Sequence, residues 1–340
     1  MARPLDEDDV RSRPGRHKSR PRSKDRPAHE TAVLGTVTTV DRGRFTVALD
    51  GNDDRLIHAV KARELGRKGL VVGDRVDLVG DSSGDPGTQA RIIRRTERTS
   101  ALRRTADDSD PIERVIVANA TQLAVVSATT NPAPNLALID RAMVAALDAG
   151  LRPLLILTKA DLASPDDVEQ AYGALREPPL HLGIFVVANR SPSEDLRTAL
   201  AGHTTVMLGE SGVGKSTLVN ALVPGTNRST GDVNLVTGKG RHTSTSVLAL
   251  RLPAGGWIID TPGVRSFGLG QVDRQHILGG FPEFTELLKN CPRSCSHDEP
   301  DCALTNWEPT QSEAVQARVR SLRRLLGTLN DRGFDATGSR

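Results

Sequence analysis

The pattern of hydrophobic and polar positions changes near residue 112, and the change divides the chain into regions. Between residues 31 and 98, short runs rich in Val, Ile, Leu and Thr alternate with turn sequences such as DRG and DSSGDPG. This pattern predicts β-strands. Five strands within about 70 residues predict a small all-β barrel of the OB or SH3-like type. The runs are AVLGTVTTV, RFTVAL, LIHAVKA, DRVDLV and QARIIRR.

From about residue 112, apolar runs alternate with longer amphipathic segments. TQLAVVSAT and LRPLLILT are typical of buried strands, and LALIDRAMVAALDAG between them has the period of an amphipathic helix that ends at Gly150. HLGIFVVAN, TTVMLGE, TSVLALRL and GWIID supply further strands. The alternation predicts a doubly wound α/β domain, with its ligand at the carboxyl ends of the strands.

Two further regions flank these domains. Residues 11–26 carry eight Lys and Arg against one Asp, so they cannot form a core and we expect disorder. Beyond about residue 273 the pattern shortens, until QSEAVQARVRSLRRLLGTLN predicts a basic amphipathic helix. The predicted division is a basic tail at 1–30, a barrel at 31–98, a linker at 99–111, the α/β domain at 112–272, a helical domain at 273–330 and a disordered tail at 331–340.

Composition and charge limit the class of protein. A chain of 340 residues with 37% hydrophobic and 3% aromatic residues fits two or three soluble domains with aliphatic cores. The sequence contains neither an apolar stretch long enough to span a bilayer nor a signal-peptide core, so we expect a cytoplasmic protein without a membrane partner. The basic tail is either a solubilising tail or an arm for nucleic acid. The arginine-rich run RIIRRTERTSALRR is either a solvated linker or a strip that faces RNA.

The stretch GESGVGKS, residues 209–216, matches G-x-x-x-x-G-K-[ST] between a predicted strand and a predicted helix. The glycines allow backbone N–H groups to surround phosphates, Lys215 neutralises the β- and γ-phosphate oxygens, and the Ser216 hydroxyl binds Mg²⁺. The candidate nucleotide-binding residues here are Gly209, Glu210, Ser211, Gly212, Val213, Gly214, Lys215, Ser216 and Thr217.

The stretch DTPG follows the strand GWIID. Asp260 at the strand end can hold the Mg²⁺ shell through water, and the Gly263 N–H can meet the γ-phosphate. Between the phosphate loop and Asp260 lies TGKGRHTSTS, residues 237–246, where the first switch of a GTPase belongs; a surface loop without function is the alternative. One hydroxyl of Thr243, Ser244 or Thr245 is expected to bind Mg²⁺, and Thr243 is the candidate.

The run LLILTKADL ends an apolar strand in T-K-x-D. The Asp161 carboxylate matches the N1–H and N2–H₂ donors of guanine, and the stem of Lys159 covers the base. A bidentate match of this kind contributes about 1–3 kcal/mol of discrimination. The candidate guanine-binding residues are Thr158, Lys159, Asp161 and Leu162, together with Ala188 and Asn189 at the end of the next strand.

These motifs occur in the order base loop, base-supporting loop, phosphate loop, first switch and second switch. A GTPase domain joined at its old termini and opened elsewhere has this order, and surface loops make such a permutation tolerable. The sequence therefore predicts a circularly permuted GTPase at residues 112–272. A nucleotide kinase or ATPase, and an RNA-binding module with a vestigial nucleotide site, are the rival interpretations.

All three cysteines of the chain lie within one short segment, C-x₃-C-x-H-x₄-C. Three thiolates and one imidazole form a closed tetrahedral set, which is typical of one structural Zn²⁺. The candidate ligands are Cys291, Cys295, His297 and Cys302; reduced cysteines without a metal are the alternative.

The barrel, the permuted motif order and the Cys₃His segment together resemble the ribosome small-subunit-dependent GTPase A (RsgA) family. The matching stretches include IERVIVANATQLAVV, NLALIDRAM, TKADL, GESGVGKSTLVNAL, GKGRHTST, DTPGVRSF and CPRSCSHDEPDC. The resemblance implies an OB-fold that contacts ribosomal RNA and GTP hydrolysis stimulated by the small ribosomal subunit during its late maturation.

The resemblance also implies that His242 helps to position the attacking water, so His242 and Lys215 are the catalytic candidates. Val264 stands where many GTPases have a water-orienting Gln, so we expect slow hydrolysis until a partner completes the site. The expected partners are GTP or GDP, the small subunit and its rRNA, bound by a monomer. An RNA-binding GTPase or ATPase with a non-ribosomal activator is the alternative.

Overall fold

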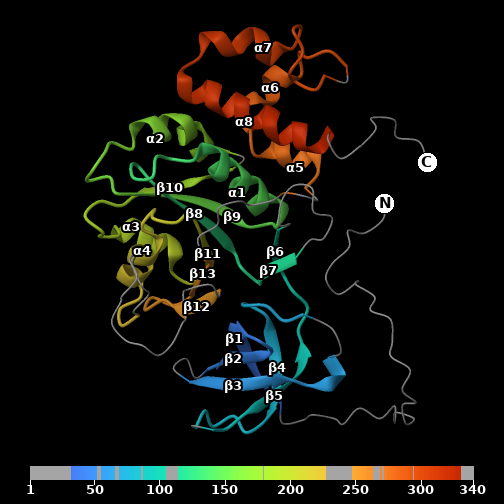
Figure 1. Cartoon of the computed structure of the whole chain (residues 1–340), viewed down its shortest axis with the longest axis vertical. Coiled ribbons are helices and arrows are strands. Elements are labelled where there is room, and N and C mark those ends of the chain that lie inside the picture. The colour runs from blue at the N-terminus through green and yellow to red at the C-terminus, as the bar shows by residue number, and fades with distance from the viewer. Residues whose placement is uncertain are drawn as a thin grey trace, which may run out of the picture.

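A computed structural model of the chain has the barrel at one end, the α/β domain in the middle and the helical module at the other end (Figure 1). The structure describes residues 32–51, 55–65, 69–85, 87–104, 114–178, 180–226, 247–262, 269, 272–293 and 295–330. None of the helices in these ranges is both long and apolar enough to cross a membrane.

The N-terminal barrel is closed. Its strands follow the order β1-β2-β3-β5-β4, and β4 pairs again with β1. The pairs are antiparallel except for β3 with β5, a Greek-key arrangement of the OB type. The interior holds alternate residues such as Val37, Val47, Ile57 and Ile92, which are fully buried. The strands are β1 (Val33–Asp41), β2 (Arg44–Leu49), β3 (Leu56–Lys61), β4 (Arg75–Gly80) and β5 (Ala90–Arg95).

The middle domain contains a sheet in the order β10-β9-β8-β11-β13-β12, parallel except for β12. β8 is buried at every position, as a central parallel strand covered on both faces requires. Because the strands are parallel, their carboxyl ends meet at one edge. The strands are β8 (Gln122–Ala128), β9 (Arg152–Thr158), β10 (Gly183–Val186), β11 (Thr204–Leu208), β12 (Leu248–Arg251) and β13 (Trp257–Asp260).

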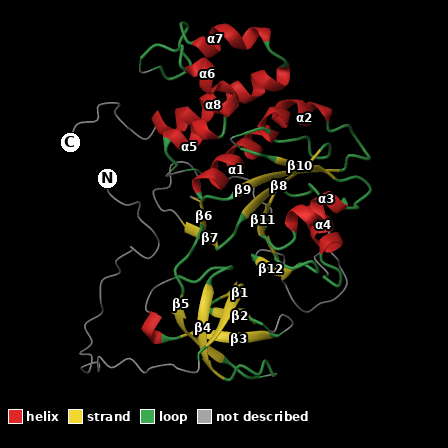
Figure 2. Cartoon of the chain, turned by 180° about the vertical axis from the view of Figure 1, so that it is seen from behind, coloured by secondary structure: helices red, strands yellow, loops and turns green. Residues whose placement is uncertain are grey.

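Helices cover both faces of this sheet (Figure 2). The helices α1 (Leu136–Asp148) and α2 (Asp166–Tyr172) share one apolar cluster with the C-terminal module, whereas α3 (Glu194–Leu200) and α4 (Lys215–Leu222) pack in a second cluster. The side chain of Asn135 caps the start of α1, and Gly150 follows its end with a left-handed φ of 67°. The predicted doubly wound α/β class is therefore confirmed.

The C-terminal module packs against α1 and α2. Its longest helix, α8, buries Val319, Leu322, Leu325 and Leu326 in the cluster that contains the inner face of α1. The module also contains a Cys/His segment between α6 and α7. The helices are α5 (Arg274–Gly279), α6 (Thr285–Leu288), α7 (Ala303–Trp307) and α8 (Glu313–Asn330).

Part of the predicted linker at 99–111 forms a strand. Strand β6 (Ala101–Arg104) pairs with β7 (Arg114–Ala118), because Leu102 is apolar and buried in the core beside α1. β1 also extends past the barrel and pairs with β12 through Thr39 and Leu248. The barrel is thus joined to the α/β sheet by backbone hydrogen bonds as well as by the chain.

Candidate nucleotide and metal sites

The phosphate loop joins β11 to α4 and depends on its glycines. Gly212 and Gly214 have φ values of 85° and 90°, the left-handed region that favours glycine. At Gly209 a Cβ atom would lie 2.5 Å from the Val126 carbonyl oxygen, so a side chain does not fit there. The loop therefore lies tightly on β8 and leads directly into the helix that begins at Lys215.

Lys215 and Asp260 lie together, although they are far apart in sequence. The Lys215 ammonium donates to an Asp260 carboxylate oxygen and to the Thr261 carbonyl. Only 8% of the Lys215 side chain and 2% of the Asp260 side chain are exposed. β11 and β13 are parallel neighbours, so the phosphate loop and the Asp at the end of β13 emerge side by side. The cation predicted to bind phosphates and the carboxylate predicted to hold the Mg²⁺ shell thus lie at one point of the sheet edge.

The T-K-x-D motif lies at the same edge. The Thr158 hydroxyl donates to the Val213 carbonyl of the phosphate loop. The Asp161 carboxylate accepts the Asn189 backbone N–H at 2.9 Å, which brings the two predicted base-binding loops together. Lys159 has a left-handed φ of 59°, and Leu162 is 65% exposed. These contacts bring the predicted base-binding loops and the predicted phosphate loop to the same edge of the sheet.

Sequence reasoning missed the β8–α1 loop, residues 129–135, which contacts both motifs. The Thr129 hydroxyl donates to the Lys159 carbonyl at 2.8 Å, and the Lys159 ammonium donates to the Asn131 carbonyl. Asn135 donates its amide N–H to the Glu210 carboxylate at 2.8 Å. The only local signal was TTNPAPN, whose Pro and Asn residues follow a buried strand and indicate a turn at the ligand-bearing edge.

Several candidates lie outside the described residues. These are His242, Gly263, the switch-loop hydroxyls including Thr243, and Val264. Ser216 and Thr217 lie in the first turn of α4, and Ala188 forms an isolated bridge with Ser191 beside Asn189.

The four predicted metal ligands are brought together. One ligand atom from each of Cys291, Cys295, His297 and Cys302 lies within 4.8 Å of the others. The Sγ atoms of Cys291 and Cys302 are 3.7 Å apart. Burial lowers the pKa of His297 and so favours the neutral imidazole that binds metals. Burial also raises the pKa of the Cys295 thiol to about 12, and a bound metal cation would favour its thiolate.

Two arginines donate hydrogen bonds to the backbone carbonyls of this cluster. Arg323 of α8 donates to the His297 carbonyl at 2.7 Å, and Arg274 of α5 donates to the Cys295 carbonyl at 3.1 Å. The Glu299 carboxylate accepts the Ser296 N–H at 2.8 Å. The donor set and its fixed backbone fit a tetrahedral metal ion of structural type.

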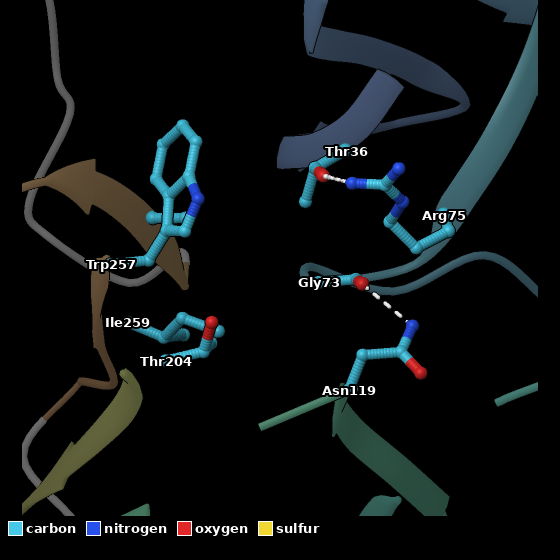
Figure 3. Close-up of a pocket in the computed structure, with 8 residues that line it drawn as sticks. Thr36, Gly73, Arg75, Asn119, Thr204, Trp257 and Ile259 are labelled. Carbon is cyan, nitrogen blue, oxygen red and sulfur yellow. Dashed lines mark hydrogen bonds between the residues drawn. The ribbon is translucent and has the colours of Figure 1, made fainter. Parts of the chain in front are cut away.

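A separate crevice of about 190 Å³ lies between the barrel and the α/β sheet (Figure 3). Its polar lining already makes hydrogen bonds, between the domains through Asn119 and within the barrel through Arg75. Asn119 donates to the Gly73 carbonyl at 2.8 Å and accepts the Thr99 N–H at 2.8 Å, while Arg75 contacts Thr36 and Asp50. We interpret the crevice as part of the domain interface. The lining residues are Thr36, Gly73, Arg75, Asn119, Thr204, Ala249, Trp257 and Ile259.

The fold and the sheet edge define the class of protein. A phosphate loop, a strand-end Asp and a T-K-x-D motif at the carboxyl ends of one parallel sheet are the parts of a P-loop GTPase domain. The base motif precedes the phosphate loop in the chain, so the domain is circularly permuted.

Comparison with known proteins identifies the family. The RsgA GTPase family model matches residues 95–270. A protein of Pseudomonas aeruginosa strain UCBPP-PA14, named small ribosomal subunit biogenesis GTPase RsgA, is 38% identical over 273 residues, which cover 78% of this chain and 77% of the relative. A protein of the same name from Ectopseudomonas mendocina is 41% identical over 267 residues, 76% of this chain and 75% of the relative. The chain belongs to the RsgA GTPase family.

Solved structures agree on the fold. YjeQ from Thermotoga maritima superposes with a TM-score of 0.61 at 24% identity, over 87% of this chain and 98% of that one. YloQ, described as a circularly permuted GTPase, gives a TM-score of 0.60 at 24% identity, over 91% of this chain and 98% of that one. The family membership confirms the resemblance and the GTPase class, and the kinase and vestigial-site interpretations are set aside.

Proposed function

We propose that this protein hydrolyses the acid anhydride of GTP to GDP and phosphate, is activated by the small ribosomal subunit, and acts late in the maturation of that subunit. The proposal rests on two contacts at the carboxyl edge of the parallel sheet: Lys215 donates to Asp260, and Asp161 accepts the Asn189 backbone N–H. The names of the relatives, small ribosomal subunit biogenesis GTPases, support the choice of partner.

The proposed roles follow from that edge. The backbone of the phosphate loop and Lys215 bind the β- and γ-phosphates, and Lys159, Asp161 and the 188–189 loop bind guanine. Mg²⁺ is held by Ser216, by Asp260 through water and by Thr243 of the first switch. His242 orients the attacking water, with Val264 in the position of the usual Gln, so hydrolysis without a partner is slow.

The other domains have proposed roles as well. The barrel at 31–98 binds ribosomal RNA. The Cys₃His cluster of the module at 273–330 holds one structural Zn²⁺. For the tails and the linker we propose the same boundaries as the sequence predicts. A partner that is assembled in the cytoplasm implies a cytoplasmic location. We propose that the protein acts as a monomer.

The test is GTP turnover with and without purified small subunits. Strong stimulation supports the partner, whereas normal nucleotide binding without stimulation points to another activator. An Asp161→Asn variant is offered GTP and XTP in parallel, and its preference is expected to move to XTP because the amide donates where the carboxylate accepted. Asp167→Asn, an exposed Asp of the same region, is the matched control and should keep its preference for GTP.

A further inference from the structure

The amide of Asn135 has two hydrogen-bond partners of different kinds. Its Oδ1 accepts the Leu138 backbone N–H at 3.1 Å and thereby caps α1. Its Nδ2 donates to Glu210 Oε1 at 2.8 Å. Glu210 is the second residue of the phosphate loop. One side chain therefore fixes both the start of α1 and a charged group of the phosphate loop.

The contact matters because Glu210 carries a negative charge next to a loop built for phosphates. If the carboxylate turned toward a bound polyphosphate, like charges would approach each other in a partly buried site, where repulsion is poorly screened. Held by Asn135, the carboxylate lies instead at the N-terminus of a 13-residue helix, where the helix dipole favours an anion. Asn135 thus keeps the loop compatible with its ligand.

The same helix is held by the C-terminal module. Arg318 of α8 donates to Asp140 of α1, with side chains only 1% and 0% exposed. Arg318 also donates to Glu283 and to the Gly280 carbonyl, so it ties α1 to the segment between α5 and α6. The Tyr172 hydroxyl donates to the same Asp140 oxygen at 2.9 Å. The module is therefore joined to α1 through a buried contact between charged side chains.

We propose that Asn135 is a positioning residue of the nucleotide site, and that α1 is the link through which the C-terminal module acts on the phosphate loop. The link runs from Arg318 through Asp140 and α1 to Asn135 and Glu210. The inference rests on the proposed function in one respect, that GTP occupies the phosphate loop.

The first experiment separates positioning from capping. Asn135→Asp keeps a good helix cap, because Asp caps as well as Asn, but it puts two carboxylates within hydrogen-bond distance. We expect the dissociation constant for a non-hydrolysable GTP analogue, measured by calorimetry, to rise about tenfold or more. A change smaller than twofold in a folded variant would mean that Asn135 only caps the helix, and would overturn the proposal.

A double variant that exchanges the carboxylate and the amide tests whether the hydrogen bond can be restored. In Asn135→Asp/Glu210→Gln the glutamine amide donates to the aspartate, so the hydrogen bond returns with its direction reversed. We expect this double variant to bind the analogue at least fivefold more tightly than Asn135→Asp. Glu210→Gln alone completes the cycle. Failure of the second substitution to improve the affinity of Asn135→Asp would contradict the role of the pair.

The second experiment tests the link over distance. Arg318→Lys keeps the charge but loses the planar group that bridges Asp140, Glu283 and Gly280. We expect it to change the GTP-analogue affinity at least threefold in the natural background and far less after Asn135→Asp. Independent sites would give effects that multiply to within about twofold, and that result would refute the link.

Two controls keep the outcomes distinct. If Arg318→Lys unfolds the module, Asp140→Asn, which preserves shape and removes the charge, takes its place in the same cycle. If the natural protein neither binds nor hydrolyses GTP, the proposed function fails. If it does both and the variants behave independently, only the link fails.

Discussion

Arg318 is a fully buried arginine, and its replacement by alanine is expected to detach the C-terminal module from the GTPase domain. Its guanidinium lies 4.9 Å from the centre of the Tyr172 ring and 4.6 Å from that of Phe281, and it binds the carboxylates of Asp140 and Glu283. The residue therefore holds elements of both domains together at a buried site.

The magnitude follows from the groups left behind. Removing one partner of a buried ion pair costs about 3–5 kcal/mol, because the other charge stays desolvated. Loss of the two ring contacts adds about 0.5–2 kcal/mol each. One effect limits the total. Burial already raises the pKa of Asp140, so without Arg318 that carboxyl can take up a proton in place of remaining charged. We therefore expect a loss of about 4 kcal/mol in the free energy of unfolding of the module.

The assay uses one of the two tryptophans as a local reporter. Trp307 packs edge-on against Phe284 in the module, at 5.9 Å between ring centres, and is the sole tryptophan in a Trp257→Phe background. Urea unfolding followed at Trp307 should move to much lower urea in Arg318→Ala. The control is Arg320→Ala on the same helix, whose side chain is 48% exposed and which should change almost nothing.

The pH dependence has a definite sign. In Arg318→Ala the folded-state pKa of Asp140 lies above its unfolded value, so the contribution of this carboxyl is favourable at low pH and is lost as pH rises through the folded pKa. The deficit of the variant should therefore grow as the pH rises above about 4, the ordinary pKa of an aspartate. Equal urea midpoints for Arg318→Ala and Arg320→Ala would refute this reasoning.

Three further predictions concern the metal, the domain junction and α1. If the Cys₃His cluster holds the proposed structural ion, treatment with a chelator should speed hydrogen exchange at α7 and α8 while β8 and β9 stay protected. Unchanged exchange at Cys302 would argue against a structural ion. Gly73→Ala should lower the free energy of unfolding by about 3 kcal/mol more than Gly43→Ala does. The reason is that a Cβ atom at Gly73 would lie 2.0 Å from the Ala118 carbonyl oxygen, whereas Gly43 faces open space. Urea unfolding of both variants measures the difference. Burial raises the pKa of Asp148, so the contribution of this carboxyl to stability falls as the pH rises through that pKa. Asp148→Asn should therefore gain stability relative to the natural protein as the pH rises from 4 to 7. A constant difference in stability over this range would contradict the reasoning.

The sequence predicted features whose chemistry restricts residue type and spacing. A phosphate loop needs glycine where φ is positive, and the structure has φ values of 85° and 90° at Gly212 and Gly214. Cysteines and a histidine gathered in one segment of a cysteine-poor chain have few explanations besides a metal, and their ligand atoms lie together. The barrel and the α/β sheet followed from period and turn residues in the same way.

Contacts between common residues far apart in sequence could not be predicted. Asn135 and Asn119 are ordinary turn residues by composition, yet one binds Glu210 and the other joins the barrel to the α/β domain. Arg318 lies in the helix that the sequence predicted to be basic and amphipathic. The helical period places Arg318 on the same face as Leu322 and Leu325, but nothing local specifies the carboxylates of Asp140 and Glu283 that pair with it there.

The arginine run that begins at Arg91 gives a final prediction of the same kind. Arg98 donates to both carboxylate oxygens of Asp74, at 2.7 and 2.9 Å, and its side chain is only 13% exposed, whereas that of Arg94 is 74% exposed. Arg98 is therefore expected to stabilise the barrel, and the exposed Arg91 and Arg94 to contact RNA phosphates.

Affinity for an rRNA fragment, measured over a range of salt concentrations, separates these roles. Arg91→Ala should weaken binding and reduce the slope of log affinity against log salt by about 1, without lowering barrel stability. Arg94→Ala should reduce the slope in the same way but should also lower barrel stability, because Arg94 pairs with the buried Asp77. Arg98→Ala should instead lower the urea midpoint of the barrel, because Asp74, which is fully buried, loses its cation. If the slope responds to Arg98 and is unaffected by Arg91 and Arg94, then the exposed arginines are a solvated surface, and RNA binds elsewhere on the protein.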